Sequence, residues 1–178
     1  MSTAALAVTP IKAPAQPMHT ISVLVRNQPG VLVRVALVFA RRGYNIESLV
    51  VSADVAHGEF SRMTITCRGD LQTLEQIIKQ VAKLIDVVHA IDHTGQSVVE
   101  TEIALVKIQA ELKSRTEVLQ IAEHYNAKVV DYGAEALILR VYGDTEKLDS
   151  FVALLRPLGV VELVRSGKIL MARGPQTT

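Results

Sequence analysis

The chain has 178 residues, a formal net charge of +1 and 49% hydrophobic residues, yet aromatic residues make up only 4% and tryptophan is absent. This length allows one medium domain or two small ones, with a core built from Val, Ile, Leu and Ala. Lys and Arg form no long run, which argues against nucleic-acid binding, and no apolar stretch reaches the ~20 residues that a membrane span needs.

Two further features bear on the compartment. The N-terminus lacks a basic region followed by an apolar signal core, so we expect a soluble, cytoplasmic protein. The single cysteine, Cys67, lies in an apolar run. It excludes an intrachain disulfide framework and predicts a buried thiol.

The first half of the chain is predicted to follow the order βαββαβ. Residues 1–18 contain three prolines and no sustained period, which predicts a flexible tail. Apolar periodicity then predicts, in order, a strand over 19–26, a turn over 27–30, a helix over 31–42, strands over 45–53 and 60–68 joined by a hairpin over 54–59, a helix from 71 to 84 and a strand over 87–91. Gly43 and Asp70 are expected to cap the first helix at its end and the second at its start.

A polar segment containing Gly95, residues 93–100, is predicted to link this unit, residues 19–92, to a second one over 101–174, followed by a short tail over 175–178. The second unit repeats the pattern. Its predicted elements are strands over 101–109, 127–132, 136–142, 160–166 and 168–173, with helices over 116–125 and around 148–155. We therefore predict an α+β protein made of two tandem ferredoxin-like βαββαβ sandwiches, each with its helices on one face of an antiparallel sheet.

A sheet of this kind leaves its outer strands open. Exposed strand edges invite pairing with another chain, and a small core gains stability from an extra interface. We therefore expect a homodimer in which the sheet is extended across a two-fold axis.

The sequence offers no recognisable catalytic machinery. The five histidines are dispersed, and the phosphate-binding patterns GxGxxG and GxxxxGK[ST] are absent. His89 and His93 have a helical spacing in a segment predicted as strand and loop, which argues against a metal site. An RNA-recognition module of the same order would need aromatic residues on its inner strands, and the runs HTISVLV and SRMTITC carry none.

The loop from Asn27 to Leu32, NQPGVL, is the strongest local feature because it leads a strand directly into a helix. Free N–H groups near Gly30, Val31 and Leu32, with the positive end of the helix dipole, suit a carboxylate. Asn27 offers a carbonyl for an ammonium group, while Val31 and Leu32 supply apolar surface. The loop thus has the parts for a small aliphatic amino acid, although the same residues also make a good strand-to-helix turn without a ligand.

A resemblance to a known family extends this interpretation. The stretch NQPGVLVRVALVFARRGYNIESLVV, followed by SRMTI, resembles the N-terminal ACT domain of acetolactate synthase small subunits. The similarity continues through LEQIIKQVAKLIDV, EIALVKI and SGKILMARG, and so covers roughly residues 19 to 174. It implies an ACT domain followed by a second, ACT-like domain.

The resemblance also implies a function. The chain would be a non-catalytic regulatory subunit that binds and activates a catalytic chain and confers feedback inhibition by valine, leucine or isoleucine in their biosynthesis. Thiamine diphosphate, FAD and magnesium would then belong to the catalytic chain, with no cofactor in this one. A free-standing amino-acid sensor acting on another partner and an assembly factor without a ligand are the alternatives. The effector-binding residues implied by the resemblance are Asn27, Gly30, Val31 and Leu32 of one chain, with Asn45 and Ile46 of its partner.

Overall fold

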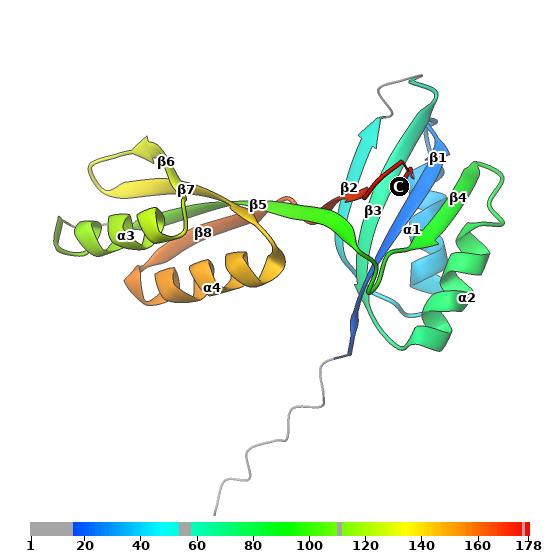
Figure 1. Cartoon of the computed structure of the whole chain (residues 1–178), viewed down its shortest axis with the longest axis horizontal. Coiled ribbons are helices and arrows are strands. Elements are labelled where there is room, and N and C mark those ends of the chain that lie inside the picture. Colours follow the sequence, from blue (N-terminus) through cyan, green and yellow to red (C-terminus); the bar gives the residue numbers. More distant parts are fainter. Residues whose placement is uncertain (1–15, 54–57, 110–111, 176) are drawn as a thin grey trace, which may run out of the picture.

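The structure is a computed structural model, and it describes residues 16–53, 58–109, 112–175 and 177–178. Two α/β units lie at either end of an elongated molecule, with β5 running from one to the other (Figure 1). The elements of the first unit are β1 (Met18–Arg26), α1 (Val31–Arg41), β2 (Ile46–Ala53), β3 (Phe60–Arg68), α2 (Leu71–Val81) and β4 (Val87–Asp92).

The second unit repeats this order and adds one strand. Its elements are β5 (Val98–Gln109), α3 (Leu112–His124), β6 (Lys128–Tyr132), β7 (Ala136–Gly143), α4 (Thr145–Leu155), the 3-10 turn η1 (Arg156–Leu158), β8 (Val160–Arg165) and β9 (Ile169–Ala172). The strands are antiparallel in the orders β2-β3-β1-β4 and β6-β7-β5-β8, and β9 pairs with the first part of β5. The predicted α+β fold of two tandem ferredoxin-like units is confirmed.

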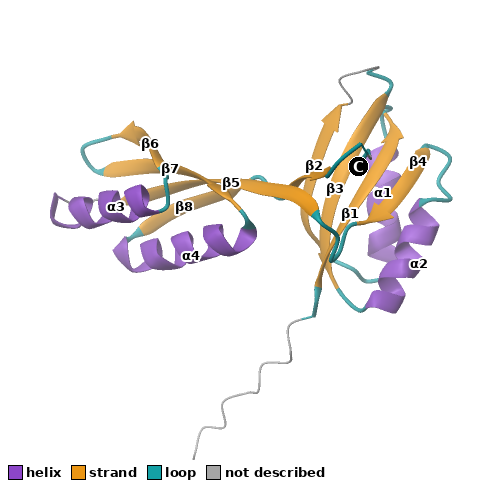
Figure 2. Cartoon of the chain, viewed as in Figure 1, coloured by secondary structure: helices purple, strands orange, loops and turns teal. Residues whose placement is uncertain are grey.

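Each unit covers one face of its sheet with its two helices (Figure 2). Alternate residues of β1 and β3 point toward α1 and α2, because side chains alternate across a strand. The first core contains the fully buried side chains of Ile21, Val23, Val25, Phe39, Ile65, Leu74 and Ile77, and the second those of Val106, Ile108, Leu137, Leu139, Leu148, Phe151 and Leu155. Cys67 lies in the first core as a free, buried thiol, as predicted.

Capping follows the predicted chemistry. The Asp70 carboxylate accepts a hydrogen bond from the Thr73 N–H at 2.8 Å at the start of α2. Gly43 follows α1 with φ of 69°, the left-handed conformation expected of a glycine that ends a helix. These two residues fix where the helices begin and end relative to the sheet.

Several boundaries differ from the prediction. Met18, assigned to the tail, lies in β1 because it pairs with Arg68. Residues 98–100, assigned to the linker, lie in β5 because β9 pairs with them, and α3 begins at Leu112 rather than Thr116. Thr178, assigned to a tail, is buried, and its hydroxyl accepts a hydrogen bond from the Ala172 N–H. Residues 1–15 of the predicted tail and 54–57 of the predicted hairpin lie outside the described residues.

The helix-free face of the first sheet is polar and covered by later parts of the chain. Thr20, Ser22, Thr64 and Thr66 are all at most 6% exposed on this face. His93 lies against Ser22, with Nε2 2.8 Å from the hydroxyl oxygen. Across the described residues, no helix is long and apolar enough to cross a membrane.

Candidate functional site

The predicted loop forms a tight turn that exposes the start of α1. Gly30 has φ of 85° and ψ of −10°, as required at the third position of a type II turn spanning Gln28 to Val31. The Val31 N–H closes this turn by donating to the Gln28 carbonyl at 3.4 Å. Among the described residues, the N–H groups of Gly30, Leu32 and Val33 meet no acceptor, so Val33 takes the place of Val31 in the predicted unpaired set.

The side chains of Val31, Leu32 and Asn27 differ in their exposure and contacts. Val31 is 2% exposed and belongs to the core, so it offers the loop no apolar surface, contrary to the prediction. Leu32 is 40% exposed and does offer such a surface. The Asn27 amide nitrogen donates to the Gly58 carbonyl at 3.3 Å, which directs the side chain toward the β2–β3 connection. An anion would therefore meet backbone N–H groups beside one exposed leucine.

The loop is attached at both ends to Asp86, the residue just before β4. The Arg26 N–H donates to the Asp86 backbone carbonyl at 2.8 Å. On the other side of the loop, Arg34 Nη2 lies 2.6 Å from Asp86 Oδ2. Nothing in the residue pattern singles out this aspartate except its position inside an apolar run, IDVV, where an acid needs a partner.

The other predicted residues, Asn45 and Ile46, lie at the start of β2. Asn45 is exposed, and Ile46 packs partly against the first core. Tyr44 anchors this segment because its hydroxyl donates to the Asp70 carbonyl at 2.8 Å, with the Asp70 carboxylate 3.1 Å away. Burial and the bond to Asp70 raise the pKa of Tyr44, so the hydroxyl stays a donor, while hydrogen bonds from Thr73 lower the pKa of Asp70.

The two groups of predicted residues do not meet within one chain. Ile46 is level with Cys67 across the β2–β3 ladder, whereas Arg26, just before Asn27, is level with Phe60. Phe60 and Cys67 are seven residue steps apart along β3, which is about 24 Å at ~3.4 Å per step. The loop and Asn45 therefore lie at opposite ends of the same sheet, and we refer to them as the two candidate half-sites.

The described residues of the first sheet are expected to hold neither a metal nor a reactive thiol. No group of three or more His, Cys, Asp or Glu side chains that could hold a metal occurs among the residues with described positions. Burial raises the pKa of the Cys67 thiol to about 11, and Asp92 and Glu47 add to the rise. The thiol therefore stays protonated at neutral pH and is a poor nucleophile.

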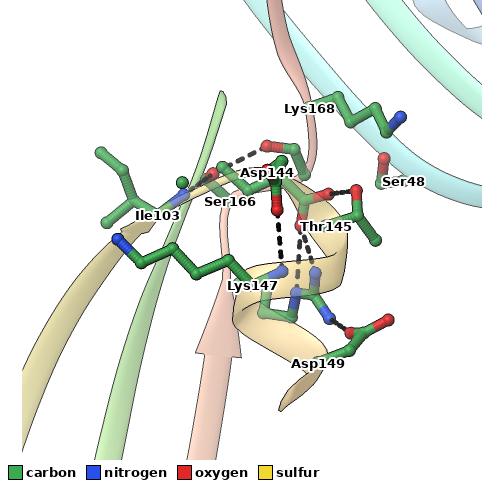
Figure 3. A network of polar contacts seen from close by, with 12 residues as sticks. Ser48, Ile103, Asp144, Thr145, Lys147, Asp149, Ser166 and Lys168 are labelled. Carbon is green, nitrogen blue, oxygen red and sulfur yellow. Dashed lines mark hydrogen bonds and ion pairs between the residues drawn. The ribbon is translucent and has the colours of Figure 1, made fainter. Parts of the chain in front are cut away.

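A polar junction with a cavity of about 680 Å³ lies between the two units. Figure 3 shows part of its network, with Asp149 labelled on α4. Arg165 contacts Glu102 at 2.6 Å and Asp149 at 2.5 Å. Burial acts to lower the pKa of Arg165, but these two carboxylates outweigh it and raise that pKa. Lys168 pairs with Glu100 at 2.9 Å. All three ion pairs lie within the second unit, and the first unit lines the cavity with Met18, Glu47, Ser48, Thr66 and Arg68.

Comparisons with known proteins place this geometry in a family. Residues 21–89 match a model described as an AHAS small subunit-like ACT domain, and residues 101–174 match one described as the small subunit of acetolactate synthase. A probable acetolactate synthase small subunit of Archaeoglobus fulgidus is 44% identical over 88% of this chain and 97% of its own. The acetolactate synthase small subunit of Mycobacterium leprae is 41% identical over 90% and 94%.

The solved structures agree with the sequences. The crystal structure of the acetolactate synthase small subunit from Thermotoga maritima superposes with a TM-score of 0.80 and is 36% identical, covering 90% of this chain and 99% of its own. The similarity thus extends over both units and the junction between them. The chain belongs to the acetolactate synthase small subunit family.

Proposed function

We propose that this chain is the non-catalytic regulatory subunit of an acetolactate synthase, which binds and activates a catalytic chain and makes it sensitive to valine, leucine or isoleucine. Family membership supports the catalytic partner. In this proposal, thiamine diphosphate, FAD and magnesium belong to the catalytic chain.

The start of α1 is the observation that carries the effector part of the proposal. Its unpaired N–H groups at Leu32 and Val33 suit a carboxylate, and the exposed Leu32 side chain suits an aliphatic one. Gly30 leaves the approach open, since a Cβ there would meet only Arg34 Nη1, at 3.9 Å. A small branched-chain amino acid satisfies both requirements at once.

The separation of the half-sites supports a homodimer. β2 is an outer strand of its sheet. Two-fold antiparallel pairing along β2 would place Asn45 and Ile46 of one chain at the end of the joint sheet where the partner's loop lies. The effector would then bind across the interface, and its preference for one dimer arrangement would change the activity of the catalytic chain. Couplings of ~1–3 kcal/mol are typical of such effects.

The proposal is tested by thermal melting of the full chain with valine, leucine, isoleucine and alanine. At a ligand concentration about 100 times Kd, binding to the folded state adds ~2.7 kcal/mol, which raises the midpoint by about 5 to 10 °C. Gly30→Asp is expected to abolish this rise, because its carboxylate repels that of the effector. Gly30→Asn is the matched control, since asparagine has the same shape and also tolerates φ of 85°.

The outcomes separate the alternatives. A rise with branched-chain amino acids that survives in Gly30→Asn and is lost in Gly30→Asp supports the site. No rise with any of them, or an equal rise in both variants, rejects it. Adding the catalytic chain then distinguishes a regulatory subunit from a sensor with another partner, because only the former changes acetolactate formation.

A further inference from the structure

Asp86 occupies an unusual position for a buried acid. The whole residue is 7% exposed and its side chain 9%, although the neighbouring Ile85 is 92% exposed. In the described part of the chain, Oδ2 has no partner other than the Arg34 guanidinium. A buried carboxylate with a single charged partner is a poor stabilising device, because desolvation cancels much of the attraction and apolar residues of similar size often serve as well. Stability alone therefore does not explain why an acid stands here.

The contacts of Asp86 indicate a different role. Its backbone carbonyl accepts from Arg26, the last residue of β1, and its carboxylate pairs with Arg34, in the first turn of α1. These residues flank the effector loop on its two sides. Asp86 thus connects the end of the strand to the beginning of the helix, from a position more than fifty residues further along the chain.

The side chain of Arg34 links Asp86 to the turn at Gly30. Helical side chains lean toward the N-terminus of their helix, so Arg34 lies over the preceding turn. Its Nη1 atom is 3.9 Å from the point where a Cβ of Gly30 would stand. The Arg34 N–H also donates to the Gly30 carbonyl at 3.1 Å. Fixing Arg34 therefore fixes Gly30 and the direction in which the unpaired N–H groups point.

We propose that Asp86 is a positioning residue of the effector site, which holds the loop in the conformation that the effector's carboxylate recognises. This inference rests on the proposed function. Asp86 does not contact the effector. It acts through Arg34 and Arg26 by reducing the freedom that the loop would lose on binding, and such preorganisation raises affinity without adding a contact.

The test compares Asp86→Ala and Asp86→Asn with wild type in the full chain. Asparagine keeps an acceptor for Arg34, so it is expected to rescue part of the loss. Glu102→Ala is the control, because Glu102 also lies 2.6 Å from an arginine and its side chain is 7% exposed against 9% for that of Asp86. Glu102 also accepts hydrogen bonds from Arg165 and Thr145, so its loss should cost at least as much stability. Calorimetric titration measures valine affinity, and amide hydrogen exchange of peptides spanning residues 26–34 reports on the loop without any ligand.

We expect valine to bind about tenfold more weakly to Asp86→Ala, with an intermediate value for Asp86→Asn. Exchange in residues 26–34 should become about tenfold faster in Asp86→Ala. Glu102→Ala should lower the melting temperature without changing either quantity. A purely structural role predicts that both alanine variants lose stability and that neither changes affinity or loop exchange.

Failure of this inference is distinguishable from failure of the proposed function. If wild type binds no branched-chain amino acid, the proposed function is rejected, and loop exchange alone decides whether Asp86 positions the loop. If wild type binds valine and Asp86→Ala binds it equally well, the positioning role is rejected and the proposed function stands. Should Asp86→Ala fail to fold, Asp86→Asn supplies the same comparison, with a smaller expected loss.

Discussion

Cys67 shows how burial changes the chemistry of one residue. It lies on the helix side of β3, is 0% exposed, and has its pKa raised by burial to about 11. In the unfolded chain its pKa returns to near 9.0. Between these values the unfolded chain releases the thiol proton while the folded chain keeps it, so this group lowers stability as pH rises through that range.

The difference in free energy of unfolding between wild type and Cys67→Ala is therefore expected to become smaller as pH rises. At pH 8 the variant should be less stable, because it leaves a small cavity. By pH 11 the wild-type thiol should have lost on the order of 2 kcal/mol relative to the variant. Urea unfolding midpoints at several pH values measure this, and a constant difference between pH 8 and pH 11 would contradict the assignment.

At the level of elements, the turn between β8 and β9 connects the two units. The Ser166 hydroxyl donates to the Gly167 carbonyl at 2.8 Å and accepts from the Ile103 N–H at 3.0 Å. Gly167 has φ of 81°, and a Cβ there would lie 2.9 Å from Ser48 on β2. Ser48 is only three residues from Asn45, so the second unit touches the strand that carries one half-site.

Gly167→Ala is expected to destabilise the chain through both backbone strain and the clash with Ser48. Strain alone costs on the order of 1 kcal/mol, and overpacking adds about 1–3 kcal/mol. Gly174→Ala is the control, because Gly174 has a similar φ of 75° and no atom of the described residues lies within 4 Å of its Cβ position. Unfolding in urea should show a clearly larger loss for Gly167→Ala. Equal losses would mean that the second unit can move away from β2 at no cost.

Many of the elements were predictable because they are amphipathic over their own length, although β6 and β8 bury neither face completely. The apolar period of three and four residues in α2 and the alternation in β1 are local signals. Pairing between distant segments gives no such local signal. Residues 98–100 were therefore predicted as a linker, although they pair with β9 in the structure. For the same reason, the loop at Asn27 was recognisable from the sequence, but its attachment to Asp86 was not.

At the scale of the whole molecule, the proposed effector site needs a second chain to bring its two halves together. The strand order is β2-β3-β1-β4, so the two chains could pair through either outer strand, β2 or β4. In a dimer paired through β2, Asn45 lies three strand spacings from β1 of the partner chain. In a dimer paired through β4, the same distance is five strand spacings. A substitution can test each edge, because Val51 on β2 is 48% exposed and Val88 on β4 is 54% exposed. Only pairing along β2 makes the dimer and the effector site depend on the same edge.

Val51→Asp is accordingly expected to convert a wild-type dimer into a monomer in sedimentation velocity, because a charge on an edge strand opposes pairing and the two-fold axis brings a second aspartate near the first. The matched control, Val88→Asp, places the same charge on the opposite edge and should remain a dimer. Val51→Asp should also lose the rise in melting temperature caused by valine, although Asn27, Gly30 and Asn45 are unchanged. A monomeric wild type, or a Val51→Asp dimer that still responds to valine, would show that the half-sites are not joined along β2. Loss of the dimer and of the valine response together, with both kept in Val88→Asp, would place the effector across this edge.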